Sequence, residues 1–261
     1  MTPRVLVTGA TGLVEQAVIE QLTAAGIPVR DFPTATESFD AALAGIDSVL
    51  LTPAGPPDPE LFARLVGAGV RRIVLLSSSS APWERRAPRA QRHFLAWEHA
   101  VEATGLERTH LRPVGLMAHA LRWADGIRRQ RLVHEGFAAA RHPYVHEQDV
   151  AAVAVAALIE DGHAGARYLL TGPAAIDIPE QIRALADALG EPVRLEELDE
   201  EDAVAQWRAQ GYDQDSIDIE LITRRDLVDK PASPRRTVER LLGRPALPFS
   251  RWAADHVEAF R

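Results

Sequence analysis

Two sets of residues in this sequence have types and spacings suited to chemistry: the glycines of a turn after the first apolar run, and the ionisable or hydroxyl side chains that follow later apolar runs. Gly9 and Gly12 come after a short apolar run and before an amphipathic stretch. Glycines at this spacing let the backbone approach a pyrophosphate, and the helix that follows would offer free N–H groups to it. The candidate residues for binding a dinucleotide cofactor are therefore Gly9, Thr11, Gly12, Leu13 and Val14.

The third position of this glycine spacing is occupied by Glu15. A carboxylate in the first turn of a helix would crowd and repel a phosphate that approaches the same helix end. The sequence therefore predicts a dinucleotide-binding fold, and it also raises the alternative that the cofactor-binding residues are vestigial.

Four side chains are candidates for acid–base catalysis: His119, His93, Glu98 and His146. His119 follows an Arg-Pro turn in an otherwise apolar stretch, where removal from water would tune the pKa of the imidazole. His93 and Glu98 share one expected helix, on which the carboxylate could orient an imidazole or take a proton itself. Any of the histidines could instead be structural or exposed, and Glu98 could belong to a solvated helix face.

A second group of candidates follows the ends of expected strands, because ligands of open α/β sheets bind outside the carboxyl ends of the strands. Serines there could donate hydrogen bonds to a substrate carbonyl, or could simply satisfy the backbone at the strand end. Apolar and aromatic side chains nearby could line a pocket for a flat ligand, or could belong to the core. The candidate substrate-binding residues are Thr52, Pro53, Ser78, Ser79, Trp83, Val114, Met117 and Trp123.

The composition excludes several classes of chemistry. The 261 residues include no cysteine, which removes disulfides, thiolate metal sites and cysteine nucleophiles. Lys230 is the only lysine, and the tyrosines are Tyr144, Tyr168 and Tyr212, so no tyrosine and lysine lie one helical turn apart. The sequence has no Gly-x-Ser-x-Gly motif and no His/Asp/Glu cluster with metal-ligand spacing, so neither a serine hydrolase nor a metal site is expected.

The charge of the chain bears on its partners. A net charge of −8 disfavours nucleic acid or an anionic membrane as the main partner. No apolar run has the length of a membrane span and the sequence shows no secretory leader, so we expect a cytoplasmic protein. The expected partner is a small-molecule substrate, bound by a monomer or a homodimer.

The elements that must position these residues alternate between short apolar runs and helical stretches. This alternation predicts right-handed crossovers and a Rossmann-like doubly wound parallel sheet, an α/β fold. We expect a single domain, residues 1–261, in which residues 1–160 form the Rossmann core and residues 161–261 a small, mostly helical lobe that is interleaved with the core. The runs expected to form the first strands are 4–7, 27–33, 47–52, 72–77 and 107–111.

Several stretches together resemble the NmrA-like family of atypical short-chain dehydrogenase/reductases. The opening VLVTGATGLV (5–14) resembles the glycine-rich start of that family, and the other stretches follow in the order expected of it. The resemblance implies an NAD(P)-binding Rossmann fold and functions that range from NAD(P)H-dependent reductases to NADP-sensing regulators and cofactor-free relatives. The later stretches are GLERTHLRP (105–113), HEQDVAAV (146–153), YLLTGP (168–173) and WAADH (252–256).

The sequence departs from this family at three places. Glu15 replaces the third glycine. Between residues 29 and 47 about one strand and its loop are missing, including the region where relatives often carry an arginine for the 2′-phosphate of NADP. The pair Asp31-Phe32 is then either the end of the second strand or the pair that contacts adenine in relatives. Phe94 and Glu98 stand where the wider superfamily carries its catalytic tyrosine and lysine.

These departures lead to three hypotheses, of which the first is favoured. It is an enzyme that handles a small apolar or aromatic, biosynthetic metabolite by cofactor-independent acid–base chemistry, such as cyclisation, isomerisation or elimination. The second is an NAD(P)H-dependent reductase of a quinone-like or enone substrate, with NADP or NAD as its cofactor. The third is a non-enzymatic regulator that senses NAD(P) or binds a protein partner.

Overall fold

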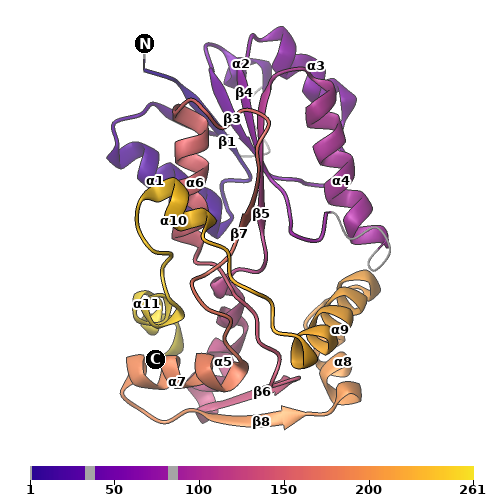
Figure 1. The fold of residues 1–261 in the computed structure, drawn as a ribbon, viewed down its shortest axis with the longest axis vertical. Coiled ribbons are helices and arrows are strands. Elements are labelled where there is room, and N and C mark those ends of the chain that lie inside the picture. The colour runs from indigo at the N-terminus through magenta and orange to yellow at the C-terminus, as the bar shows by residue number, and fades with distance from the viewer. Residues whose placement is uncertain (1, 33–38, 82–87) are drawn as a thin grey trace.

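The computed structural model describes residues 2–32, 39–81 and 88–261, which form two lobes (Figure 1). The larger one, the core lobe, is built on a six-stranded parallel sheet with strand order β2-β1-β3-β4-β5-β7. The prediction of an α/β, doubly wound parallel sheet is therefore confirmed. Its strands are β1 (Val5–Thr8), β2 (Val29–Phe32), β3 (Ser48–Leu51), β4 (Arg72–Leu76), β5 (Glu107–Pro113) and β7 (Arg167–Leu170).

Helices cover both faces of this sheet, which explains why its strands are short apolar runs. Alternate residues of a strand point to opposite faces. Val5 and Val7 accordingly join one hydrophobic cluster, and Leu6 joins the other. The first cluster is covered by α1 (Leu13–Ala24) and α6 (Glu147–Ile159), and the second by α2 (Phe39–Leu43), α3 (Pro59–Gly67) and α4 (Pro88–Ala103).

The sheet ends at β2, which pairs with β1 alone in the described part of the chain. A Rossmann sheet ordinarily carries one further strand beyond its second strand, in the order 3-2-1-4-5-6. No such strand occurs among the described residues, in keeping with the short segment between residues 29 and 47. Asp31 and Phe32 pair with Val7 and Thr8, so they form the end of the second strand of the sheet.

The smaller lobe, the small lobe hereafter, surrounds two parallel strands, β6 (Leu132–Gly136) and β8 (Arg194–Leu198). Trp123, Trp252 and Phe260 fill its core. Among the described residues, no helix of either lobe has the length and apolarity required to cross a bilayer. The helices of the small lobe are η1 (Met117–Trp123), α5 (Ala124–Gln130), α7 (Ile178–Leu189), α8 (Glu200–Ala209), α9 (Gln214–Asp229), α11 (Phe249–Asp255) and η2 (Val257–Phe260).

The chain passes repeatedly between the two lobes. After β6 it returns to the core lobe for α6 and β7, and then builds most of the small lobe. It comes back once more as α10 (Thr237–Leu242), which packs on α6 and β7, before α11 packs against α7. Figure 1 shows these late segments, in yellow, running along both lobes.

A buried ion network ties α9 to β6 inside the small lobe. Arg224 donates to Glu220 at 2.7 Å and to the carbonyl of Gly136 at 3.3 Å, and its guanidinium lies 3.2 Å from Glu135. Arg122 also donates to Glu135, at 2.6 Å. Burial alone would raise the pKa of Glu135, but the two guanidinium groups outweigh it and hold that pKa below its usual value. The network fixes α9, which forms one wall of the site described next.

Candidate functional site

The glycine turn between β1 and α1 has the geometry of a nucleotide cradle. Gly9 has a φ of +72°, and the N–H of Gly12 donates to the carbonyl of Gly9 at 3.0 Å. A Cβ atom at Gly9 would lie 3.1 Å from the Cβ of Thr52, so both backbone conformation and space favour glycine there. The turn that the sequence predicts is thus formed, with the N-terminus of α1 beside it.

The space of this cradle is filled by Glu15. Its side chain is buried, and Oε1 accepts a hydrogen bond of 2.5 Å from the hydroxyl of Thr52. Oε2 lies 2.0 Å from the point where a Cβ atom of Gly12 would stand. The missing side chain of the second glycine is what lets a pyrophosphate approach the turn. In this conformation the cradle therefore does not fit a pyrophosphate.

The adenosine side of the groove also differs from a complete dinucleotide site. The sheet stops at β2 in the described part of the chain, and Asp31 presents an exposed carboxylate at its end. The guanidinium of Arg30 donates to the carbonyls of Ala41 and Ala42, at the C-terminal end of α2. Arg30 is thus held against the end of α2.

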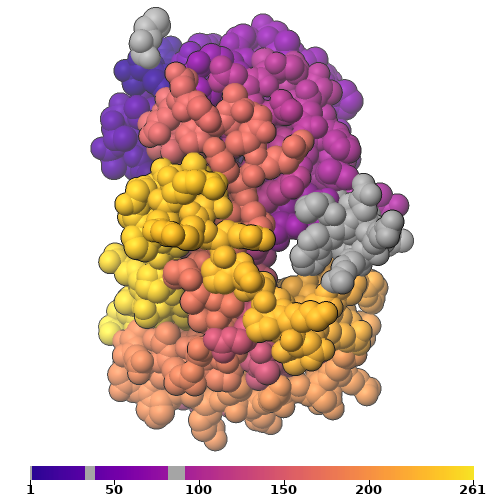
Figure 2. All heavy atoms as spheres, viewed as in Figure 1, coloured from indigo at the N-terminus to yellow at the C-terminus, as the bar shows by residue number. Residues whose placement is uncertain are grey.

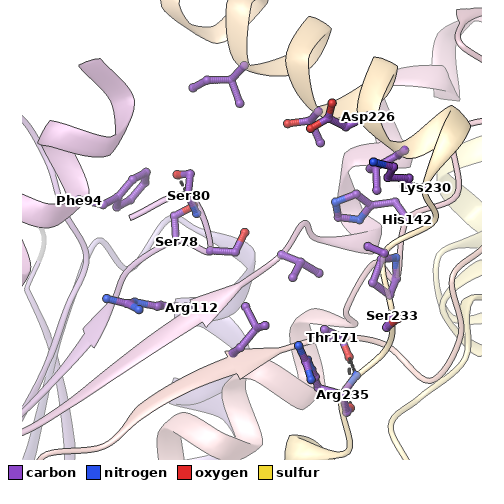
Figure 3. A pocket seen from close by; sticks show the side chains of 18 of the residues that line it. Ser78, Ser80, Phe94, Arg112, His142, Thr171, Asp226, Lys230, Ser233 and Arg235 are labelled. Atoms are coloured by element: carbon purple, nitrogen blue, oxygen red, sulfur yellow. Dashed lines mark hydrogen bonds between the residues drawn. The ribbon is translucent and has the colours of Figure 1, made fainter. Parts of the chain in front are cut away.

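A separate cavity of about 750 Å³ opens between the two lobes. Figure 2 shows the surface hollowed where the lobes meet, and Figure 3 shows the side chains that line the cavity. Ser78 and Ser80 after β4, Phe94 of α4 and Arg112 of β5 form one side. The other side is formed by residues before α6, by α9 and by the chain that follows it. Its labelled members in Figure 3 are His142, Asp226, Lys230, Ser233 and Arg235.

The lining of this cavity is rich in positive charge, although the chain as a whole carries −8. Asp226 is the acidic residue among its described lining residues. Two of the four basic residues have carboxylate partners, since Arg112 pairs with Glu98 and Arg167 with Glu102. The other two, Lys230 and Arg235, form no ion pair with any residue in the described ranges. The basic lining residues are Arg112, Arg167, Lys230 and Arg235.

Glu98 is held in a buried pair and does not face the cavity as an acid or a base. It is 1% exposed, and it accepts hydrogen bonds from Arg112 at 2.5 and 2.9 Å and from Ser77 at 2.5 Å. Burial alone would raise the pKa of Glu98, but these donors outweigh it and the pKa lies below its usual value. The carboxylate is therefore ionised at neutral pH, and it orients Arg112 along the cavity wall.

The sequence analysis missed His142, which lines the cavity. Its backbone is fixed by hydrogen bonds of 3.0 and 3.2 Å with Ile176, and its ring lies 4.5 Å from the ring of Tyr144. Burial lowers the pKa of His142 to about 4, so the imidazole is neutral at physiological pH. Its buried Nδ1 has no hydrogen-bond partner among the described residues. The available signal was a histidine beside a proline just before the α6 segment.

The predicted catalytic histidines do not line this cavity. His119 lies in η1 and is exposed, although the protein around it and the guanidinium of Arg122 lower its pKa. His93 lies on α4, with its ring 5.2 Å from that of Phe94. His146 caps α6 by accepting from the N–H of Gln148. His119 lies close enough to the cavity residue His142 to interact with it electrostatically, and the ring of His93 contacts that of the cavity residue Phe94, so both stand beside the cavity without lining it.

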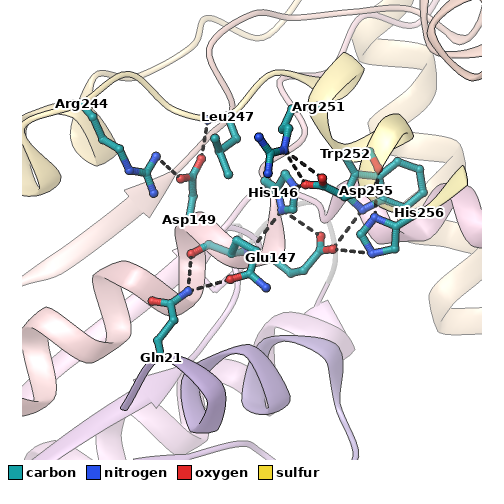
Figure 4. Close-up of polar contacts among 11 residues, drawn as sticks. Gln21, His146, Glu147, Asp149, Arg244, Leu247, Arg251, Trp252, Asp255 and His256 are labelled. Carbon is teal, nitrogen blue, oxygen red and sulfur yellow. Dashed lines mark hydrogen bonds and ion pairs between the residues drawn. The ribbon is translucent and has the colours of Figure 1, made fainter. Parts of the chain in front are cut away.

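His146 belongs to a polar cluster where the N-terminal end of α6 meets α11 (Figure 4). Its Nε2 lies 3.6 Å from Asp255 of α11. The neighbouring Glu147 accepts from the indole of Trp252 and lies 3.0 Å from Nε2 of His256. The cluster therefore joins α6 of the core lobe to α11 of the small lobe. No group of three or more His, Asp or Glu side chains suited to a metal ion occurs in the described part of the chain.

The predicted substrate-binding residues fall into three groups. Ser78, Ser79 and Val114 line the cavity. Met117 and Trp123 are buried in the small lobe, where the indole of Trp123 donates to Glu135, so both are core residues. The third group lies away from the cavity or outside the description: Thr52 bonds Glu15, Pro53 follows it, and Trp83 falls among the residues that the structure does not describe.

Comparisons with known proteins identify relatives over almost the whole chain, although no family model matches. The chain is 36% identical to a (4-alkanoyl-5-oxo-2,5-dihydrofuran-3-yl)methyl phosphate reductase of Streptomyces griseus, over 98% of this chain and 99% of that one. It is 29% identical to an NAD(P)H azoreductase of Xenophilus azovorans, with the same coverage. An NADPH-dependent quinone oxidoreductase of Escherichia coli matches in fold, with a TM-score of 0.76, 21% identity and coverage of 96% and 98%.

These relatives bear on the hypotheses drawn from the sequence. They are reductases, so they support an enzyme, and they favour the reductase alternative over the cofactor-independent acid–base reaction that we preferred. They also do not support the expectation that no cofactor is used. The alignment with the Streptomyces relative spans 279 positions, so that protein carries residues that these 261 lack. The chain belongs to the family of Rossmann-fold reductases that includes the (4-alkanoyl-5-oxo-2,5-dihydrofuran-3-yl)methyl phosphate reductase of Streptomyces griseus.

Proposed function

We propose that the chain is an NmrA-like reductase of a small unsaturated carbonyl compound that carries a phosphate or a similar anion. The observation that carries the proposal is the cavity between the lobes, whose described lining residues include four basic residues and one acidic residue in an acidic chain. The name of the Streptomyces relative describes such a substrate, a phosphate ester of an unsaturated lactone. NADH or NADPH, which the names of relatives favour, would bind once Glu15 leaves the cradle, would supply the hydride and would be oxidised to NAD⁺ or NADP⁺.

Two sets of side chains in the cavity suit the two ends of such a substrate. Lys230 and Arg235 have no carboxylate partner in the described ranges, so both are available to bind an anion. Hydride addition to an unsaturated carbonyl compound places negative charge on the carbonyl oxygen, which hydrogen-bond donors stabilise. Ser78, with Oγ 2.9 Å from Oγ of Ser80, and the neutral His142 line the cavity and are the candidate donors. Arg112 lines the cavity as well, but its charge is compensated by the ion pair with Glu98.

Removal of the positive charges of Lys230 and Arg235 is expected to abolish selectivity for an anionic substrate. We expect the wild-type protein to bind a phosphorylated unsaturated lactone at least about 10-fold more tightly than the corresponding alcohol, which corresponds to ~1.4 kcal/mol. The double variant Lys230→Met, Arg235→Met should bind both compounds equally, with affinity for the alcohol unchanged. Titration calorimetry measures both dissociation constants.

The matched control is Arg236→Met, because Arg236 is the exposed neighbour of Arg235, pairs with Glu239 and does not line the cavity. This variant should keep the wild-type preference. Equal binding of ester and alcohol by the wild-type protein would contradict the anion site. Failure of the ester to cause oxidation of either NADH or NADPH, at concentrations that saturate the cavity, would contradict the assignment as a reductase.

A further inference from the structure

We infer that the carboxylate of Glu15 is an internal occupant of the pyrophosphate cradle, so that a dinucleotide binds this chain only when that side chain is displaced. The carboxylate stands in the space that Gly12 leaves free, with Oε2 2.0 Å from the position of an added Cβ atom. The Glu15 side chain is only 4% exposed, so it is packed into the turn and does not extend into solvent.

Thr52 holds the carboxylate in this position. Its hydroxyl donates to Oε1 of Glu15 at 2.5 Å, and its own N–H donates to Oγ1 of Thr8 at 3.0 Å. Oγ1 of Thr8 in turn donates to the carbonyl of Leu50 at 3.1 Å. These hydrogen bonds tie the Glu15 carboxylate to β1 and β3, the two strands whose carboxyl ends border the cradle. Thr52 acts here as a positioning residue for Glu15.

The charge of Glu15 disfavours a bound pyrophosphate, as does the space that its side chain occupies. The N-terminus of α1 has no side-chain hydrogen-bond cap, and Glu15 is the acidic residue of its first turn. An anion near a helix N-terminus is favoured by the helix dipole, and here the chain itself provides that anion. A pyrophosphate would have to replace one negative charge at this helix end, or to lie beside it at a cost in free energy.

This inference deepens the proposed function, because it concerns the cofactor half of the same enzyme. It names the residue that controls access of the dinucleotide, and its test measures binding and not turnover. Titration with the phosphate ester and the alcohol measures binding to the cavity and does not involve the dinucleotide. A failure of one proposal can therefore be distinguished from a failure of the other.

The test is a fluorescence titration of the full chain with NADH and with NADPH. We expect Glu15→Gly to bind at least one of them 10-fold or more tightly than the wild-type protein. Thr52→Val, which frees the carboxylate but keeps its charge, should give an intermediate gain. Glu20→Gly is the matched control, because it places the same substitution at an exposed acidic position of the same helix. This control should bind as the wild-type protein does.

Circular dichroism and thermal melting establish that each variant is folded before titration. Wild-type binding as tight as that of a folded Glu15→Gly protein would overturn the inference, since Glu15 would then not obstruct the cradle. A folded Glu15→Gly protein that binds neither dinucleotide would overturn it as well, because the barrier would lie elsewhere. An equal gain in Glu20→Gly would show that net charge, and not the position of Glu15, is responsible.

Discussion

Replacement of Arg224 by methionine is expected to lower the free energy of unfolding by about 3–5 kcal/mol, the range found when one partner of a buried ion pair is removed. Arg224 is 5% exposed, and it contacts two carboxylates, those of Glu220 and Glu135. Its loss leaves the negative charges of both carboxylates less well neutralised inside the small lobe. It also removes the contact of the guanidinium with the face of Trp207, at 5.3 Å.

Equilibrium denaturation with urea measures this change. Arg225→Met is the control, because Arg225 is the adjacent residue and its pair with Glu200 is exposed to solvent. An exposed pair contributes about 0–1 kcal/mol, so the control should unfold close to the wild-type midpoint. Similar losses in the two variants would show that the buried network does not hold α9. Because α9 forms one wall of the cavity, Arg224→Met should also weaken binding of the substrate.

Acidification from pH 6.5 to pH 4 is expected to remove about 3 kcal/mol of stability through His142 alone. The pKa of His142 is about 4 in the folded chain, whereas an unperturbed histidine has 6.5. Between these two values the unfolded chain binds more protons than the folded chain, so the free energy of unfolding falls as the pH falls. Each unit of pKa difference corresponds to about 1.4 kcal/mol.

His142→Gln removes this contribution and keeps a polar side chain of similar size. The variant should therefore lose about 3 kcal/mol less than the wild-type protein when urea midpoints at pH 6.5 and pH 4 are compared. His134→Gln, at an exposed histidine of β6, serves as the control and should follow the wild-type curve. An equal loss in wild-type protein and His142→Gln would mean that the imidazole is not kept neutral by burial.

Most of the core lobe was predictable because its signals are local. The run 72–77 is short and contains the β-branched residues Ile73 and Val74, which favours a buried strand, and the spacing of Gly9 and Gly12 marks the turn. The effect of Glu15 could also be predicted, because a residue at the third position of the glycine spacing lies in the first turn of the helix, next to the phosphate-binding turn. The strand β6 was not predicted, because its sequence, Leu-Val-His-Glu-Gly, lacks a continuous apolar run and its pairing with β8 is distant in sequence.

The candidate site was less predictable because contacts between distant elements decide it. Glu98 looked like a partner for His93 on one helix, yet it pairs with Arg112 on a neighbouring strand. His142 and Lys230 face one cavity only because α9 docks against the loop before α6. Periodicity cannot show such a docking. His142 was not among the candidate histidines for the same reason, since the wall of a cavity cannot be seen in the sequence.

The path of the chain between the lobes has a consequence for how the protein can fold during synthesis. The central sheet receives β7 only after the first strand of the small lobe has been made, and the small lobe receives Trp252 and Phe260 at the end. The core lobe is complete only after α10 and the small lobe only after Phe260, so early-folding units are few and contacts are long in sequence. A gene fragment that encodes one lobe would therefore not encode a unit that folds alone.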